Sequence, residues 1–190
     1  KGIPPELRTL VVVPTMLTNL ESIEALVEAL EIRFLSNRDN NLHFGLLTDF
    51  CDADGEQLPE DEPLLQLAGQ RITELNDKYR IPAGDTFFLF HRPRRWNPQD
   101  RKWMGHERKR GKLADLNSLL RGRLEQRFAR VVGDTALLTT IRYVITLDTD
   151  TLLARDTAWR MIGTMAHPLN RACFDPERQR VVAGYGILQP

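Results

Sequence analysis

Short apolar runs rich in β-branched residues alternate along this chain with longer stretches of helical periodicity. Runs of this length between turn-forming residues are typical of buried strands. Strands that alternate with helices favour a parallel sheet joined by right-handed crossovers. We therefore predict an α/β fold with a Rossmann-like, mostly parallel sheet flanked by helices. The expected strands are residues 9–15, 42–50, 85–90, 143–147 and 181–188, and the expected helices are residues 20–36, 64–79 and 112–130.

The composition is that of an ordinary globular chain. Its 190 residues are 42% hydrophobic and 27% charged, with a formal net charge of zero, so no global field attracts nucleic acid or a membrane. No apolar run approaches the roughly 20 residues that a membrane-spanning helix needs. Cys51 and Cys173 lie far apart in sequence and make neither a disulfide framework nor a metal cluster. We expect both to be reduced thiols.

The two ends of the sequence indicate where the domain starts and whether it is whole. Residues 1–7 are interpreted as a linker or an artificial chain start, and residues 8–190 as the folded domain. The chain stops at an expected strand, which natural domains rarely do. We therefore predict a truncated domain that belongs to a larger protein.

Two carboxylates, Asp148 and Asp150, follow the apolar run Tyr143–Leu147. The carboxyl ends of strands are where open α/β sheets bind ligands. Two acids one residue apart repel each other unless a cation neutralises them. A hard divalent metal that also bridges phosphate oxygens would do so. The alternative is a strand end whose acids only cap the next segment.

A second candidate site is the start of the helix expected from Lys112. Residues 105–117 join a basic, glycine-containing loop to a helix N-terminus, an arrangement that binds anions. Lys112, Asp115 and Asn117 could meet a diphosphate and a nucleoside there. A solvated helix start is the alternative.

The segment from Arg92 to Lys112 holds nine Lys or Arg residues against Asp100 and Glu107, and also Trp96 and Trp103. We expect a long loop, and long loops are often functional. This segment supports an alternative function, a non-catalytic binding module. Its tryptophans could stack on sugar faces or on single-stranded bases, or could rest on anionic lipid. A solvated loop is equally open.

Other nucleotide and phosphate sites are disfavoured by missing motifs. No Gly-X-Gly-X-X-Gly follows the first strand and no Gly-Lys-Ser/Thr occurs, which argues against dinucleotide and P-loop sites. Residues 145–152 resemble the apolar-Asp-X-Asp-X-Thr signature of haloacid dehalogenase phosphatases, in which the first Asp is a nucleophile. That motif should open the domain and precede a lysine and an acid pair. The 40 residues after Asp150 contain neither, so the phosphatase is the less favoured alternative.

Four motifs in order resemble the nucleotide-sugar glycosyltransferases of the GT-A type, specifically the family 2-like processive synthases. They are Val11–Thr15, Asp49, Lys112–Asn117 and Asp148–Asp150. Three further segments look similar to the glycosyltransferase region of the cyclic β-1,2-glucan synthases. Those segments are residues 46–50, 91–97 and 105–112.

The resemblance implies a UDP-glucose donor, a divalent cation (Mg²⁺ or Mn²⁺), and inverting transfer to a growing β-1,2-glucan acceptor. It also implies a large protein with this region on the cytoplasmic face of a bacterial inner membrane. Other parts of that protein would reach the membrane, and no nucleic acid partner is expected. The implied metal ligands are Asp150 and Asp148. The implied donor-binding residues are Pro14, Thr15, Asp49, Lys112, Asp115 and Asp148.

The family's catalytic base is an Asp in a Thr-Glu-Asp-like motif well after the acid pair, followed by a Gln-X-X-Arg-Trp acceptor motif. Neither occurs between Thr151 and Pro190. We therefore expect no catalytic residue in this chain, a general base beyond Pro190, and a missing acceptor half. Asp156 follows the acid pair too closely to serve as the base, and Asp175 and Glu177 are expected to face solvent.

Overall fold

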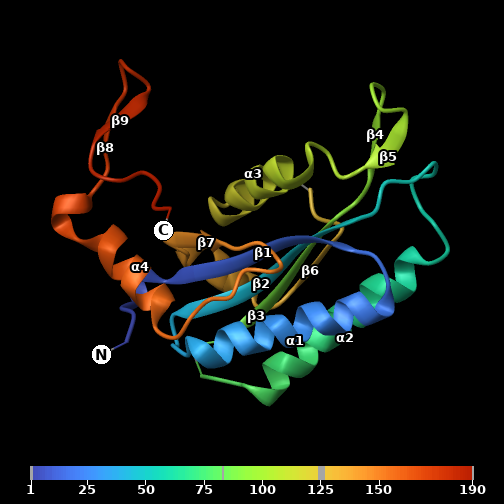
Figure 1. Cartoon of the computed structure of the whole chain (residues 1–190), viewed down its shortest axis with the longest axis horizontal. Helices are drawn as coiled ribbons and strands as arrows, with labels where there is room; N and C mark the ends of the chain where they lie inside the picture. Colours follow the sequence, from blue (N-terminus) through green and yellow to red (C-terminus); the bar gives the residue numbers. More distant parts are fainter. Residues whose placement is uncertain (1, 83, 124–126, 190) are drawn as a thin grey trace.

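A five-stranded sheet with the order β6-β3-β2-β1-β7 forms the centre of the computed structural model, which describes residues 2–82, 84–123 and 127–189 (Figure 1). β1, β2, β3 and β7 run parallel, and β6 pairs antiparallel with β3. The predicted mostly parallel, Rossmann-like sheet flanked by helices is confirmed. The elements are β1 (Thr9–Leu17), α1 (Leu20–Ser36), β2 (Leu42–Phe50), α2 (Asp61–Lys78), β3 (Phe87–Arg92), β4 (Arg95–Asn97), β5 (Lys102–Met104), α3 (Arg108–Leu120), β6 (Arg130–Val132), β7 (Tyr143–Thr146), α4 (Thr157–Ala166), β8 (Cys173–Asp175) and β9 (Arg180–Ala183).

α1 begins and ends where the sequence predicts. The Asn19 side chain accepts a hydrogen bond from the Ser22 amide at 2.8 Å, and the Ser22 hydroxyl accepts one from the Asn19 amide at 3.3 Å. This reciprocal capping box satisfies two amides that a helix start would leave without partners. β2 also matches its predicted range, and it is buried along its whole length.

Successive residues of each central strand point to opposite faces, so the sheet has two cores. Val11 and Val13 of β1 face α1 and α2, whereas Leu10 and Val12 face α3. Figure 1 shows α1 and α2 covering one face and α3 the other. α4 contributes Ala158 and Ile162 to the core beneath α1 and α2. Within the described residues, no helix is long and apolar enough to cross a membrane.

The helix predicted over residues 112–130 is wrong at both ends. α3 starts at Arg108 and stops at Leu120, where Gly122 adopts a left-handed conformation with φ of 69°. The Gly122 and Arg123 amides donate to the carbonyls of Leu119 and Ser118 at 3.0 and 3.1 Å, which closes the helix in a Schellman-type end. Residues 124–126 of the predicted helix lie outside the described residues. The chain then forms β6, which the sequence analysis missed.

Further segments differ from the sequence predictions, among them α4 and β8, for which no element was expected. Residues 95–104 form the β4–β5 hairpin, so the long loop expected from Arg92 to Lys112 is partly ordered strand. The strand expected over residues 181–188 is shorter and lies outside the central sheet: β9 pairs only with β8. Both hairpins project from the body of the molecule (Figure 1). Smaller shifts affect α2, which starts three residues earlier than predicted, and β3, which starts two residues later.

Candidate functional site

A pocket of about 300 Å³ lies where the parallel strands end. The end of β1, the end of β2, the start of α3 and the turn after β7 all contribute to its wall. Of the predicted donor-binding residues, Pro14, Thr15, Asp49 and Lys112 line it directly. The remaining lining residues are Met16, Phe50, Asp52, Gly105, Arg108, Lys109 and Thr149. Thr149 brings the turn that carries Asp148 and Asp150 to the mouth of this pocket.

Asp49 lies at the floor of the pocket in a buried network of charges. Arg92 donates to both carboxylate oxygens of Asp49 at 2.9 Å each and to Asp115 at 2.6 Å. The Lys112 ammonium lies 3.1 Å from Asp49 and donates to the Thr15 carbonyl at 2.6 Å. Arg127 binds the second oxygen of Asp115 at 2.7 Å. Lys112 therefore ties α3 to the ends of both β1 and β2.

Burial and pairing act in opposite directions on these groups. Burial lowers the pKa of the Lys112 ammonium, while the nearby Asp49 carboxylate raises it in part. Burial alone would raise the pKa of Asp115, but Arg92 and Arg127 together hold it below its usual value. Asp115 does not line the pocket; it acts beneath the floor, through Arg92.

The acid pair predicted to hold a metal lies on an exposed turn. Asp148, Thr149 and Asp150 are all exposed, and the Thr151 amide donates to the Asp148 carbonyl at 3.1 Å. Lys109 of α3 forms an ion pair with Asp148 across the mouth of the pocket. Within the described residues, no three His, Cys, Asp or Glu side chains form a preassembled metal site. Two carboxylates suit Mg²⁺ or Mn²⁺ when phosphate oxygens and water supply the other ligands, which is how Mg²⁺ is usually held.

The start of α3 is shaped by close backbone packing. Glu107 and Arg108 have positive φ angles of 51° and 47°, which non-glycine residues rarely adopt. A Cβ at Gly111 would lie 2.0 Å from the His106 carbonyl oxygen, and one at Gly105 would lie 2.2 Å from an Asp49 oxygen. Glycine is thus required on both sides of the turn. This tight turn places the N-terminus of α3, which is the positive end of the helix dipole, at the pocket together with Arg108 and Lys109.

Three arginines that organise this edge were missed by the sequence analysis. Arg92 holds Asp49 and Asp115, Arg33 binds the turn after β7, and Arg94 forms a buried pair with Asp61. A signal existed for Arg92 and Arg94, because Arg92 ends the apolar strand β3 and Arg94 lies two residues after it. Arg33 lies on α1, three residues after the core residue Leu30, at the flank of the apolar stripe.

The tryptophans of the predicted basic loop form part of an ordered hairpin. Trp96 and Trp103 are opposite each other on β4 and β5, with ring centroids 5.9 Å apart. Trp103 also exchanges two backbone hydrogen bonds of 2.9 Å with Ala53, and Lys102 pairs with Asp54. The hairpin is therefore fastened to the acidic segment after β2. Trp96 stays half exposed.

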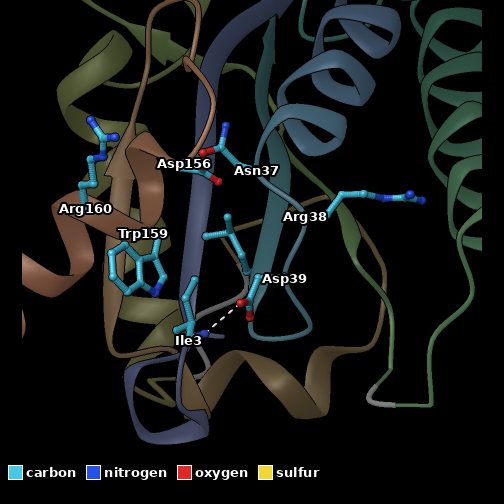
Figure 2. A pocket seen from close by; sticks show the side chains of 8 residues that line it. Ile3, Asn37, Arg38, Asp39, Asp156, Trp159 and Arg160 are labelled. Carbon is cyan, nitrogen blue, oxygen red and sulfur yellow. Dashed lines mark hydrogen bonds between the residues drawn. The ribbon is translucent and has the colours of Figure 1, made fainter. Parts of the chain in front are cut away.

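A second pocket, of about 340 Å³, lies at the opposite edge of the sheet, where β2 begins (Figure 2). Two of its polar side chains bond within the protein: Asp39 accepts from the Ile3 amide at 2.8 Å, and Asn37 donates to three backbone carbonyls. Figure 2 shows the Arg38 side chain directed away from the other labelled residues, and Arg160 next to Trp159. None of the predicted donor-binding residues lines it. This pocket lies where the end of α1, the N-terminal segment and α4 pack against one another.

Comparison with known proteins identifies one relative. No family model matches the sequence. The chain is 41% identical over 189 residues to the cyclic beta-(1,2)-glucan synthase NdvB of Rhizobium meliloti (strain 1021). The match covers 100% of this chain and 7% of that protein. The resemblance to the cyclic β-1,2-glucan synthases is thereby confirmed, and the chain corresponds to a small part of such a protein.

Proposed function

We propose that this chain binds the sugar-nucleotide donor of a glucan synthase, with UDP-glucose as the donor and β-1,2-glucan as the product of the whole protein. The observation that carries the proposal is the convergence of three features on one pocket. The carboxylate turn of Asp148 and Asp150, the basic start of α3 and the ends of β1 and β2 all meet there. The similarity to a protein named as a glucan synthase supports the choice of donor.

Asp148 and Asp150 are the proposed ligands of Mg²⁺ or Mn²⁺. When bound, such a cation would stabilise the negative charge that develops on the departing nucleotide. The ion pair with Lys109 supports this proposal, because it already places a positive charge beside the Asp148 carboxylate. Transfer with inversion at the sugar carbon is part of the proposal.

The remaining residues bind and orient the donor. Pro14, Thr15 and Asp49 form the part of the wall proposed to hold the nucleoside. Arg108 and Lys109, at the amino end of α3, are placed to attract the diphosphate. Lys112 and Asp115 fix this geometry: Lys112 bonds to Thr15 and Asp49, and Asp115 anchors Arg92. A preformed wall lowers the entropy cost of binding.

Calorimetric titration of UDP with and without Mn²⁺ tests the proposal directly. We expect saturable binding that depends on the metal. Binding that is unchanged when the metal is omitted would refute the role of the acid pair. No binding by the folded protein in either condition would refute the donor site itself. Competition between UDP and UDP-glucose then tests whether the sugar adds to the affinity.

A further inference from the structure

Arg33 of α1 is buried against the turn that carries Asp148 and Asp150. Its side chain is 3% exposed and donates to main-chain carbonyls of that turn. The bonds reach Thr149 at 2.7 Å, Thr151 at 2.9 and 3.1 Å, and Asp148 at 3.4 Å. One planar guanidinium therefore holds three carbonyls of a four-residue turn, a geometry that a lysine ammonium would not reproduce.

Among the described residues, the charge on Arg33 is compensated by carbonyl oxygens and not by a carboxylate. Within the part of the chain that the structure describes, no carboxylate lies at ion-pair distance from this guanidinium. Burial lowers the pKa of Arg33, yet an arginine keeps its proton at any working pH. A buried unpaired cation is costly unless hydrogen bonds compensate it. The three carbonyls supply that compensation, so the turn and the arginine depend on each other.

Asn37 makes a second set of contacts one helical turn later. Its amide donates to the Leu153 and Ala154 carbonyls at 3.1 Å each and accepts from the Ala158 amide at 3.2 Å. Asn37 is the residue that ends α1, and its amide also donates to the Arg33 carbonyl at 3.4 Å. Arg33 holds the part with the carboxylates, and Asn37 holds the part that leads into α4.

We infer that Arg33 is a positioning residue for the acid pair, an inference that rests on the proposed function. By turning three carbonyls toward α1, it leaves the Asp148 and Asp150 side chains exposed at the mouth of the pocket in a fixed arrangement. Metal ligands that are held in place by supporting hydrogen bonds bind with less loss of freedom. The buried positive charge also offsets part of the repulsion between two carboxylates and an incoming diphosphate.

The first test does not need the donor. Hydrogen exchange of the wild-type chain and of Arg33→Met and Arg33→Lys is followed by mass spectrometry. We expect faster exchange in peptides covering residues 147–152 in both variants, with unchanged protection in β1 and β2. Arg38→Met is the matched control, because Arg38 is an arginine near the same helix end that packs on the Phe34 and Tyr79 rings instead. Normal exchange at residues 147–152 in both Arg33 variants would overturn the inference.

The second test measures binding of UDP with Mn²⁺. We expect Arg33→Met to weaken metal-dependent binding by about tenfold or more, the usual effect of losing a residue that orients metal ligands. Arg33→Lys should weaken it less, Asn37→Ala less again, and Arg38→Met should leave it unchanged. Wild-type affinity in Arg33→Lys with normal exchange would overturn the inference, even if Arg33→Met failed to fold. If the wild-type chain itself bound no UDP, the proposed function would fall, while the exchange test would still decide whether Arg33 holds the turn.

Discussion

Arg92 donates two parallel hydrogen bonds, both 2.9 Å long, to Asp49, and both side chains are almost fully buried. This fork-to-fork geometry is the strongest form of ion pair that side chains make. It also sets the shape of the pocket floor, where the Lys112 ammonium lies 3.1 Å from the same carboxylate. Buried ion pairs thus hold the proposed nucleoside wall together in the absence of a ligand.

Asp49→Asn should lower the free energy of unfolding by about 3–5 kcal/mol, since it leaves Arg92 and Lys112 as insufficiently compensated buried cations. Urea unfolding followed by fluorescence measures this. Asp54→Asn is the matched control, because Asp54 and its partner Lys102 are exposed and solvent screens the pair. Equal stability of the two variants would show that the buried network contributes nothing specific.

Asp150→Asn should abolish the metal-dependent part of UDP binding and leave the fold intact. The side chain is exposed, and neutralising one member of a like-charged pair relieves repulsion, so the melting temperature without metal should hold or rise slightly. Asp156→Asn is the control from the same segment, away from the candidate pocket. A drop of several degrees in the metal-free melting temperature of Asp150→Asn would identify Asp150 as a structural cap.

The stability of the protein should fall as the pH drops from 7 to 5, in part because of His91. Burial lowers the pKa of His91 from its ordinary 6.5 to about 4. Between these two pH values the unfolded chain therefore binds a proton at His91, whereas the folded chain does not. This difference in pKa contributes at most about 3 kcal/mol to the free energy of unfolding. The contribution is fully present above about pH 6.5 and is lost as the pH falls toward about 4. His91→Gln should flatten the dependence of unfolding free energy on pH.

Two controls sharpen that measurement. His106→Gln changes an exposed histidine and should leave the slope as in the wild type. His43 is also buried with a lowered pKa, so a residual slope should persist in His91→Gln. An identical slope in His91→Gln and the wild type would contradict the assignment.

Gly105→Ala should destabilise the protein, whereas Gly163→Ala should stabilise it. A Cβ at Gly105 would lie 2.2 Å from an Asp49 oxygen, so the buried ion pairs would have to shift. Gly163 lies in α4 with nothing within 4 Å of its added Cβ, and alanine there should contribute about 0.5–1 kcal/mol through helix propensity. Melting temperatures that move in the same direction would refute the argument from packing.

This chain alone should not elongate a glucan, because transfer needs a base within reach of the acceptor hydroxyl. The acids after the carboxylate turn are badly placed for that task. Asp156 lines the pocket at the other edge of the sheet, Asp175 accepts two amides of its own hairpin turn, and Glu177 is exposed. Slow hydrolysis of UDP-glucose is the most we expect. Incubation with donor, metal and an oligoglucan primer tests this; elongation at about 1 per second or faster would contradict it.

The elements that the sequence predicts correctly are those with agreeing local and global signals. α1 has both a capping residue, Asn19, and an unbroken apolar stripe, so its ends follow from neighbouring residues alone. The helix predicted over residues 112–130 is too long because leucines continue at helical spacing past Gly122, whose left-handed conformation ends α3. That glycine was a readable signal. The prediction for β9 was wrong for a different reason, because nothing in its sequence indicates which strand it pairs with.

The gathering of Pro14, Thr15, Asp49 and Lys112 at one pocket follows from topology, since parallel strands end at a common edge. Their roles as donor ligands stay predictions. The side chains that hold these residues could not be predicted in the same way. The bond from Arg33 to Thr149 spans 116 positions and depends on how β7 is seated beside β1. Such contacts are a property of the assembled fold.

The strand order has a consequence for how the protein is assembled during synthesis. β1 pairs over all nine residues with β2, the next strand to leave the ribosome, but over only four residues with β7. Contacts between distant parts of a chain form late, so the floor of the pocket can be built while the carboxylate turn is still unmade. A nascent chain that stalls before residue 143 would leave the outer edge of β1 unpaired, the kind of edge that attracts chaperones or seeds aggregation.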